Sequence, residues 1–542
     1  MKKVLVILIL IIGVFLRFYK LGDLPNSFTP DELAQGYTAY SFLQTGKDEW
    51  GNTNPFILRS FGDFKAPLQT WLMIPSIKLF GLTPFAVRFP NALISSLALL
   101  TTYLLTNSLF GLSSVSMITL MLLTFSPWHL PMSRLALEAN LTVFFSTLAT
   151  YVYLKKPKSF KHQLLASILF SLNLFTYHSA KFFTPILMLA TYIYVHRFKN
   201  VKSFFNSLFK NIFFILPFTL FFLLNIFQSF SSSDRVGDIS IFNPTDHWAG
   251  LSDDRYLLVQ NNLPDFVSRI FNNKIVYVSK TFFTSLFSYF SPQFLITQGA
   301  GETTYGMLPG FGVIGFIPFI GFIYSLYLLF QKSKHQSTLL YLLALIVFSA
   351  FPAALAKGSY PGNRLATMIP FIIIFSAFGL SQIFLKLSKP LKLLIYLLFI
   401  YSSMSFLITY FYSANSRLSQ GMLYGRRQAV EYVQKKGSDS KILFSRSLSQ
   451  PQTYYLFFAK TNPQDVQVAS KEWLNYKKEN KNFLDQLGEY HLDNVTFGNI
   501  SRESFADYDF VIGKPDEFVD QIPTQIIFYP NSNKASLYIY EK

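Results

Sequence analysis

The decapeptide "SFTPDELAQG" (27–36) follows the apolar run "VLVILILIIGVFL" (4–16) and places two acids, Asp31 and Glu32, side by side. Carboxylates are costly near hydrocarbon. Helices that only anchor a chain in a bilayer usually end in Lys, Arg, Trp or Tyr instead. The acidic pair therefore needs an explanation beyond anchoring, and the remainder of the chain supplies its context.

The composition indicates a polytopic membrane protein. Of the 542 residues, 51% are hydrophobic and 14% are charged, with 61 Phe and 31 Tyr. Soluble domains carry about 25% charged residues. The net charge of +18 does not indicate a nucleic-acid surface, because most of the excess Lys and Arg lies in short links between apolar runs. The absence of cysteine excludes disulfides, Cys-based zinc sites, Fe–S clusters and thiol catalysis.

Apolar runs predict about eleven transmembrane helices, since a span needs about 20 mainly apolar residues. The predicted spans are 4–18, 85–109, 112–127, 137–154, 163–177, 181–196, 207–229, 308–330, 337–356, 364–386 and 390–412. The first run is followed by "RFYK" (17–20) rather than by a small-residue cleavage site, so we expect it to be retained as a helix.

The charges between the runs predict the orientation. Four short links contain Lys or Arg and no acid: "KKPKSFKH" (155–162), "RFKNVKSFFNSLFK" (197–210), "QKSKH" (331–335) and "KLSKPLK" (386–392). The predicted spans place all four on the side of Lys2 and Lys3, which the positive-inside rule makes cytoplasmic. The opposite side receives 19–84, 128–136, 178–180, 230–307, 357–363 and the carboxyl-terminal segment, with nearly all of the acids.

We therefore expect an α-helical polytopic membrane domain over 1–413 and a small extracytoplasmic α/β domain over 414–542. In the first outer loop (19–84), "APLQTWLMIPSIKLFG" (66–81) predicts an interfacial helix. The outer loop 230–307 is long for a structureless connection, which favours a functional lid or short helices. In the carboxyl-terminal segment, strands are predicted at 441–446, 494–499, 509–514, 525–530 and 536–542, and helices at 425–437 and 470–488.

Polar side chains gather at the outer ends of the predicted spans. If the helices pack as a bundle, several of these residues meet at the outer membrane surface. The candidates are Asp31, Glu32, Asp63, Lys65, His129, Arg134, Glu138, Tyr177, His178, Lys181 and Arg364.

This set of residue types suits transfer of a sugar from a phosphate-bearing donor. Asp31 or Glu32 could act as a general base on an acceptor hydroxyl. Fixed cations could hold the phosphate, and the candidates are Lys65, Arg134, Lys181 and Arg364. A water-soluble nucleotide sugar does not reach this side easily, whereas a lipid-linked phosphosugar carries its phosphate at the membrane surface.

Two segments resemble a known family. "PDELAQGYTAYSFLQTG" (30–46) and "FGDFKAPLQTWLMIPSIKLFGLTPFAVRFPNAL" (61–93) resemble the amino-terminal signature of the GT-C class of membrane glycosyltransferases. The nearest branch is that of the dolichyl-phosphate-mannose protein mannosyltransferases and the lipid A aminoarabinose transferases. The shared pattern is an acidic pair, a Lys-x-Pro-like step at Lys65, Phe80-Gly81, and Arg-x-Pro at 88–90. The likeness covers about residues 10–185, with Ala66 standing where the family often has Pro.

The resemblance implies roles for individual residues. Asp31 corresponds to the catalytic base or an acceptor-orienting carboxylate, and Lys65 to the residue that holds the carrier phosphate. Glu138 corresponds to a residue that supports the acceptor or the catalytic centre. Lys181 and Arg364 are implied as phosphate or sugar contacts. The family also implies inversion at the anomeric carbon.

Structural interpretations stand beside these roles. The acids can cap a helix that begins near Thr29 and Pro30. Arg134 and Glu138 can form a local i,i+4 pair on one helix. His129 and His178 lie in different loops and do not predict a tight zinc site, whereas a divalent cation at Asp31 stays open.

The leading hypothesis is a membrane enzyme that moves a sugar from a polyprenyl or dolichyl monophosphate carrier to an extracytoplasmic acceptor, which could be a protein, a lipid or a glycan. The alternative is a transporter or flippase of lipid-linked sugars. Such a protein would place its ionisable groups near the middle of the membrane. A third hypothesis is an adhesion protein whose helices only anchor it.

Overall fold

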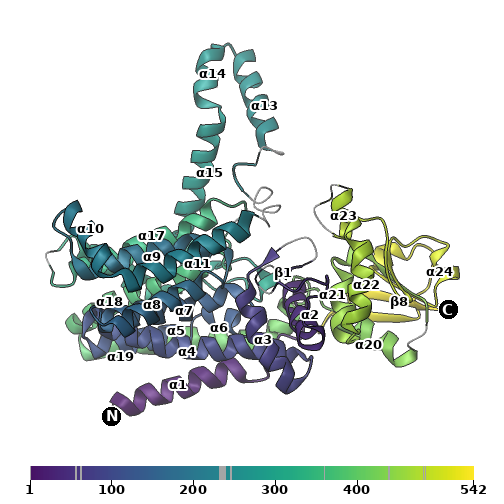
Figure 1. Cartoon of the computed structure of the whole chain (residues 1–542), viewed down its shortest axis with the longest axis horizontal. Helices are drawn as coiled ribbons and strands as arrows, with labels where there is room; N and C mark the ends of the chain where they lie inside the picture. The colour runs from purple at the N-terminus through teal and green to yellow at the C-terminus, as the bar shows by residue number, and fades with distance from the viewer. Residues whose placement is uncertain are drawn as a thin grey trace.

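The computed structural model describes residues 2–542 except 55, 57, 61–63, 231–239, 244–246, 332, 359, 438–439, 480 and 482–483. Asp63, one of the predicted site residues, lies outside the described residues. The chain forms a bundle of long helices with a carboxyl-terminal sheet region at one end of it (Figure 1).

Helices occupy the places of all the predicted spans. They are α1 (Lys2–Phe18), α4 (Pro84–Phe110), α5 (Ser113–Thr124), α7 (Leu141–Lys155), α8 (Phe160–Asn173), α9 (His178–His196), α11 (Ile212–Phe230), α16 (Phe316–Leu329), α17 (Gln336–Ala354), α18 (Ile369–Lys386) and α19 (Lys389–Arg417). By length and composition, four helices in the described part of the chain can cross a membrane, or five if one bent pair counts as a span. The protein is thus a multi-pass helical membrane protein, and the number of eleven spans stays a prediction.

The bent pair differs from the predicted continuous span over 207–229. The helix α10 (Val201–Lys210) ends at Asn211, and α11 leaves it at 85°. Asn211 fixes this corner, because its side-chain amide donates to the Ser207 carbonyl and accepts a hydrogen bond from Gln163 Nε2. The break follows from these polar contacts inside the apolar bundle, which hydropathy alone does not reveal.

Close packing in the bundle relies on glycine where α16 meets α18. A Cβ atom on Gly379 would collide with the Gly321 carbonyl oxygen, and one on Gly321 would collide with the Ser376 carbonyl oxygen. Ser325 Oγ also donates to the Phe375 carbonyl across this contact, at 2.6 Å. Small residues that let helix backbones approach are a common device in membrane bundles.

The segment predicted as the first outer loop (19–84) folds into short elements at one end of the bundle (Figure 1). They are α2 (Pro30–Thr45), the paired strands β1 (Leu58–Arg59) and β2 (Phe64–Lys65), and α3 (Pro67–Phe80). The segment predicted as an interfacial helix is α3, with Pro67 in its first turn and Gly81 at its end. Between α5 and α7 lie α6 (His129–Ser133) and the short turn η1 (Glu138–Asn140).

The carboxyl-terminal region contains a six-stranded mixed sheet in the order β4-β5-β3-β6-β8-β7. The strands are β3 (Ile442–Ser445), β4 (Tyr490–Leu492), β5 (Val495–Gly498), β6 (Phe510–Gly513), β7 (Gln525–Phe528) and β8 (Ala535–Glu541). β3 runs parallel to β5 and β6, and the outer pairs are antiparallel. The five predicted strands all correspond to strands of this sheet, and β4 is an addition to them. The predicted boundary after residue 413 falls within the end of α19.

Helices of this region begin and end partly where the sequence predicts. α20 (Arg426–Lys436) ends at Gly437, as expected for the helix predicted over 425–437. The helix predicted over 470–488 is wrong in its bounds, because α22 (Pro463–Trp473) starts earlier and the short α23 (Asn475–Lys478) follows it. Asn462 caps α22 by accepting a hydrogen bond from Gln464 N, and Pro463 occupies the first turn. The helix α21 (Pro451–Phe458) packs against α2.

Candidate functional site

The two adjacent acids at the start of α2 have different contacts. Thr29 is the N-cap, its hydroxyl accepts a hydrogen bond from Glu32 N, and the Glu32 carboxylate accepts one from Thr29 N. Pro30 occupies the first helical position. This reciprocal arrangement is a capping box, which satisfies two backbone donors at the helix start. Glu32 therefore carries the capping role, and Asp31 takes no part in it.

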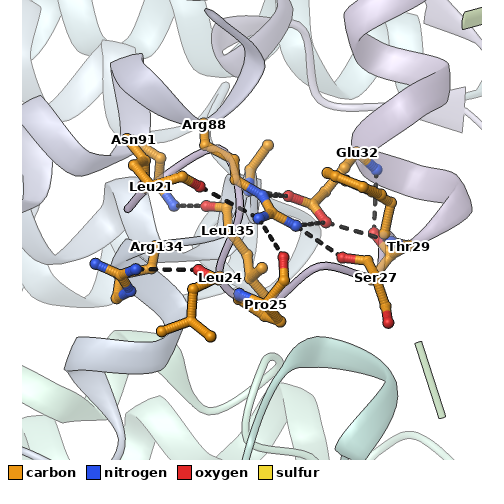
Figure 2. A network of polar contacts seen from close by, with 12 residues as sticks. Leu21, Leu24, Pro25, Ser27, Thr29, Glu32, Arg88, Asn91, Arg134 and Leu135 are labelled. Carbon is orange, nitrogen blue, oxygen red and sulfur yellow. Dashed lines mark hydrogen bonds and ion pairs between the residues drawn. The ribbon is translucent and has the colours of Figure 1, made fainter. Parts of the chain in front are cut away.

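Glu32 also forms a fully buried ion pair with Arg88 from α4, with Nε 2.9 Å from Oε1 and both side chains 0% exposed. The same Arg88 guanidinium donates to the backbone carbonyls of Leu21, Pro25 and Ser27 (Figure 2). Removing one member of such a pair leaves a buried charge without compensation. The Arg-x-Pro motif thus holds the loop between α1 and α2 in place.

Arg134 and His129 are structural residues in the same framework. Both are fully buried. The Arg134 guanidinium donates to four carbonyls at the end of α1 and in the loop after it, which belong to Leu16, Arg17, Tyr19 and Leu24. The His129 Nδ1 atom lies 2.8 Å from Arg17 Nη2. These contacts favour a positioning role for Arg134 over phosphate binding.

The local i,i+4 pair expected between Arg134 and Glu138 is not supported by the helix boundaries. Arg134 is the C-cap of α6, whereas Glu138 begins the separate turn η1. Ala136, between them, donates its N–H to Glu32 Oε1 at 3.0 Å. This segment is therefore tied to α2, and Arg134 and Glu138 do not share a helix.

Asp31 and Lys65 form an ion pair, with Lys65 Nζ 3.0 Å from Asp31 Oδ1. The Asp31 side chain is 23% exposed and that of Lys65 is 10% exposed. Lys65 reaches this position from β2, directly before α3. Unlike the Glu32–Arg88 pair, this pair keeps partial access to its surroundings, which a reacting group requires.

Further predicted residues lie near this pair. The charged groups that act electrostatically on the Tyr177 hydroxyl come from four separate segments: Lys65, Glu138, Glu302 and Arg364. Glu138 also acts on Lys181 of α9. Arg364 is anchored through Nη1, which donates to the Lys357 carbonyl at 2.6 Å. His178 lies beside β2, with Nε2 3.1 Å from the Phe64 carbonyl oxygen.

The structure adds two residues that the sequence analysis did not single out, Glu302 and Tyr305. Asp31 and then burial raise the pKa of Tyr305, with Tyr177 and Glu302 adding to the rise and Lys65 opposing it. Burial raises the pKa of Glu302, against hydrogen bonds from the backbone of Asn363 and Gly362. The only signal for them was the unusual length of the loop 230–307, since no spacing connects them to Asp31.

Glu302 also orders the loop that carries Arg364. Its Oε2 atom accepts a hydrogen bond from Asn363 N at 2.9 Å. On the other side of the same loop, Trp128 Nε1 donates to the Gly362 carbonyl at 3.1 Å. Arg364 is thus presented by a loop with partners on two sides, which limits its movement.

The carboxyl-terminal region contacts α2 directly. The Tyr454 hydroxyl donates to the Phe28 carbonyl at 2.6 Å, and the Tyr37 hydroxyl donates to the Thr461 carbonyl at 2.7 Å. The Phe28 ring meets the Phe458 ring edge to face at 5.5 Å. Phe28 lies three residues before Asp31, so the carboxyl-terminal region supports the segment that carries this acid.

The described residues at Asp31 supply no set of metal ligands. Among the described residues, no group of three or more His, Cys, Asp or Glu side chains is arranged to hold a metal ion. Asp31 faces the ammonium group of Lys65 at 3.0 Å, a cation where a metal would need another ligand.

Similar proteins are known from sequence and from structure. No protein-family model matches the chain. An uncharacterized protein of Aquifex aeolicus (strain VF5) is 29% identical over 189 residues, which span 34% of this chain and only 36% of that relative. The archaeal oligosaccharyltransferase AglB from Archaeoglobus fulgidus, in complex with an inhibitory peptide and a dolichol-phosphate, is 13% identical, with a TM-score of 0.47 over 95% of this chain and 69% of that one.

A more extensive likeness is to ArnT from Cupriavidus metallidurans bound to undecaprenyl phosphate. The TM-score is 0.53 at 12% identity, and the match covers 98% of this chain and 97% of that chain. The resemblance predicted from the segments around Asp31 and Lys65 is therefore confirmed at the level of the fold. The chain has the fold of the GT-C membrane glycosyltransferases.

Proposed function

We propose that this protein is a membrane glycosyltransferase that takes a sugar from a polyprenyl or dolichyl monophosphate carrier and passes it to an acceptor outside the cytoplasm. The observation that carries the proposal is the partly exposed Asp31–Lys65 pair at 3.0 Å. It joins a carboxylate suited to a base with a cation suited to a phosphate. The GT-C fold supports the reaction class.

The proposed orientation follows from the charges of the loops. The amino terminus lies in the cytoplasm with the basic links, whereas α2 and the carboxyl-terminal region lie outside. The carrier's tail would then remain in the bilayer, and its phosphate would reach Lys65 at the outer membrane surface. This geometry requires no soluble nucleotide donor, because the sugar is already activated by its bond to the carrier phosphate.

In the proposed reaction, the acceptor hydroxyl oxygen attacks the anomeric carbon and forms the new glycosidic bond. The bond from that carbon to the phosphate oxygen breaks, and its electron pair remains on the carrier phosphate. The hydroxyl proton passes to Asp31. Lys65 stabilises the negative charge of the leaving phosphate. Attack opposite the leaving phosphate inverts the anomeric configuration.

The contact between Asp31 and Lys65 suggests how donor binding prepares the base. A carrier phosphate competes with Asp31 for the Lys65 ammonium group, and binding of the phosphate releases the carboxylate to meet the acceptor. Arg364 and Lys181 are further proposed contacts to the phosphate or the sugar. Electrostatic interactions connect Tyr177, Tyr305, Glu138 and Glu302 with this centre.

The proposal is tested with the purified protein in liposomes that contain radiolabelled polyprenyl-phosphate sugars. The readout is transfer of the label from the carrier lipid to water or to an added protein, lipid or glycan acceptor. Lys65→Met should raise the apparent KM for the donor about tenfold to a hundredfold, because charge-assisted hydrogen bonds contribute about 1.5–3 kcal/mol. Lys78→Met is the matched control, since Lys78 is an exposed residue in the last turn of α3. Failure of the wild-type protein to consume any polyprenyl-phosphate sugar would contradict the proposed function. A shift of the donor to the other leaflet without bond cleavage would instead indicate the transporter.

A further inference from the structure

Three helices between α11 and α16 form a hairpin that we call the arm: α13 (His247–Gln260), α14 (Asp265–Phe271) and α15 (Lys274–Ser288). Figure 1 shows the arm standing out from the side of the bundle, across the direction in which α1, α4 and α19 run. Most of its described side chains are exposed. Of the described residues, α14 buries only Ser268 and α15 buries only Leu286.

The arm is rooted near one end of a membrane-spanning helix. The Phe282 ring of α15 meets the Phe351 ring of α17 edge to face at 5.4 Å. Phe351 lies three residues before the end of α17 at Ala354, and α17 is long and apolar enough to cross the membrane. The loop with Arg364 follows directly. The root of the arm therefore lies near the membrane boundary on the side of the proposed site.

The exposed surface of the arm is strongly apolar. In α13, the four consecutive residues from Tyr256 to Val259 are all large, apolar or aromatic, and exposed. Successive residues of a helix point in different directions, so apolar side chains are exposed all around this part of α13. In α14 and α15, large apolar side chains are more than half exposed: Phe266 67%, Ile270 58%, Phe271 65%, Ile275 79%, Phe283 52% and Phe287 68%. Soluble proteins rarely expose such an apolar surface to water.

The charged residues of the arm indicate how deeply it can lie in a membrane. Asp265 of α14 pairs with Arg269 at 2.7 Å and with Arg255 of α13 at 3.8 Å, and all three side chains are at least one third exposed. Exposed ion pairs are costly in the hydrocarbon centre and acceptable among lipid headgroups. Helices that combine large apolar residues with charges commonly lie in the plane of the membrane interface.

The apolar surface is continuous with the side of the bundle that faces lipid. Phe348 of α17 is 38% exposed, and its ring lies 5.2 Å from that of Phe351. Phe351 contacts Phe282, whose neighbour Phe283 is half exposed on the arm. A row of aromatic rings thus leads from a membrane-spanning helix onto the arm without a polar interruption, which favours lipid over a protein partner as the surrounding medium.

We propose that the arm lies in the headgroup interface of the leaflet that borders Asp31 and Lys65, with its large apolar side chains inserted between lipids. The occupant of this surface is the bilayer itself. The arm then lies along the membrane beside the proposed site. This inference depends on the membrane-spanning bundle and holds whether or not the chain transfers sugars.

The absence of cysteine in the chain allows a clean test with single-cysteine labels. Phe266→Cys and Ile275→Cys each receive an environment-sensitive NBD fluorophore, in the full-length protein in phosphatidylcholine vesicles. Leu397→Cys on α19, 54% exposed, is the control inside the membrane, and Val468→Cys on α22, 67% exposed, is the control in water. Because all four side chains are exposed, the labels replace no core contacts.

Both arm labels should show blue-shifted emission and should be quenched by lipids that carry a doxyl group. Quenching should be stronger for doxyl near the headgroup than for doxyl deep in the acyl chain, whereas the Leu397 label should show the reverse order. Emission and quenching like those of the Val468 label would overturn the proposal. Blue-shifted emission without quenching by lipid would also overturn it, since it would place the arm against a second copy or folded onto the protein.

Discussion

The Lys65 ammonium group lies 3.0 Å from the Asp31 carboxylate, although 33 residues, including most of α2, separate them in the chain. The neighbouring acid, Glu32, points to Arg88 and is fully buried. One acidic dipeptide therefore supplies two ion pairs with different tasks. The buried pair holds the loop, and the accessible pair is the proposed reaction centre.

Tyr305→Phe should lower kcat/KM for sugar transfer about twofold to tenfold, because the variant loses a hydroxyl group, whose hydrogen bonds contribute about 0.5–1.5 kcal/mol each, at a position on which Asp31 acts electrostatically. Tyr412→Phe on α19, where the side chain is 84% exposed, provides the matched control. The measurement is the initial rate of transfer at several donor concentrations. Equal rates for the two variants would place Tyr305 outside the site.

Glu32→Gln and Arg88→Met should each destabilise the protein by about 3–5 kcal/mol, since each leaves a buried charge without its partner. Thermal unfolding in detergent, followed by tryptophan fluorescence, measures the effect. The double variant should lose less than the sum of the single variants because the two residues are in contact. Single variants as stable as the wild type would show that the pair does not hold the loop.

Glu49 should make stability depend on pH. It lines a small cavity between α2 and the carboxyl-terminal region, and burial, followed by the charge of Asp48, raises the pKa of Glu49 well above its usual value. Burial also raises the pKa of Asp48, against hydrogen bonds from Asn52 and Trp50 and the charge of Arg59. A raised folded-state pKa gives stability that is complete below the usual pKa of about 4.5 and is lost as the pH rises through the folded-state value.

Glu49→Gln should remove most of this pH dependence and should make the protein more stable than the wild type at high pH. Trp50 and Trp473, whose ring centres lie 6.0 Å apart at this contact, provide the fluorescence signal for melting curves between pH 4 and pH 9. Asp507→Asn, an exposed residue of the carboxyl-terminal region, is the control. The same pH slope in the wild type and Glu49→Gln would contradict the assignment.

The sequence predicts the local elements of this fold well. Apolar runs locate the long helices, Thr29 and Pro30 locate the start of α2, and short apolar stretches locate five strands of the carboxyl-terminal sheet. These features depend on residues close together in the chain. The bend at Asn211 was not predicted, because the hydrogen-bond partner Gln163 comes from a distant helix.

In the candidate site, too, the sequence predicts local features but not contacts between distant segments. The motif around Asp31 and Lys65 identifies both residues, but it does not reveal that they form one ion pair. The role of Arg134 depends on carbonyls at the end of α1, and that of Glu302 depends on the loop before Arg364. Contacts of this kind arise only when separate helices pack, so residue type and spacing could not distinguish structural cations from those of the site.

Single-turnover sugar transfer by Asp31→Asn, in liposomes loaded with a polyprenyl-phosphate sugar that the wild type consumes, tests most directly whether Asp31 is the base. Asp507→Asn, an exposed residue of the carboxyl-terminal region, serves as the control, and unchanged thermal unfolding verifies that each variant is folded. We expect a transfer rate about 10²–10⁴-fold below the wild type. Donor affinity should be equal or tighter, because Lys65 no longer has a carboxylate competing with the phosphate. Transfer by Asp31→Asn at the wild-type rate would contradict the role of Asp31 as the base.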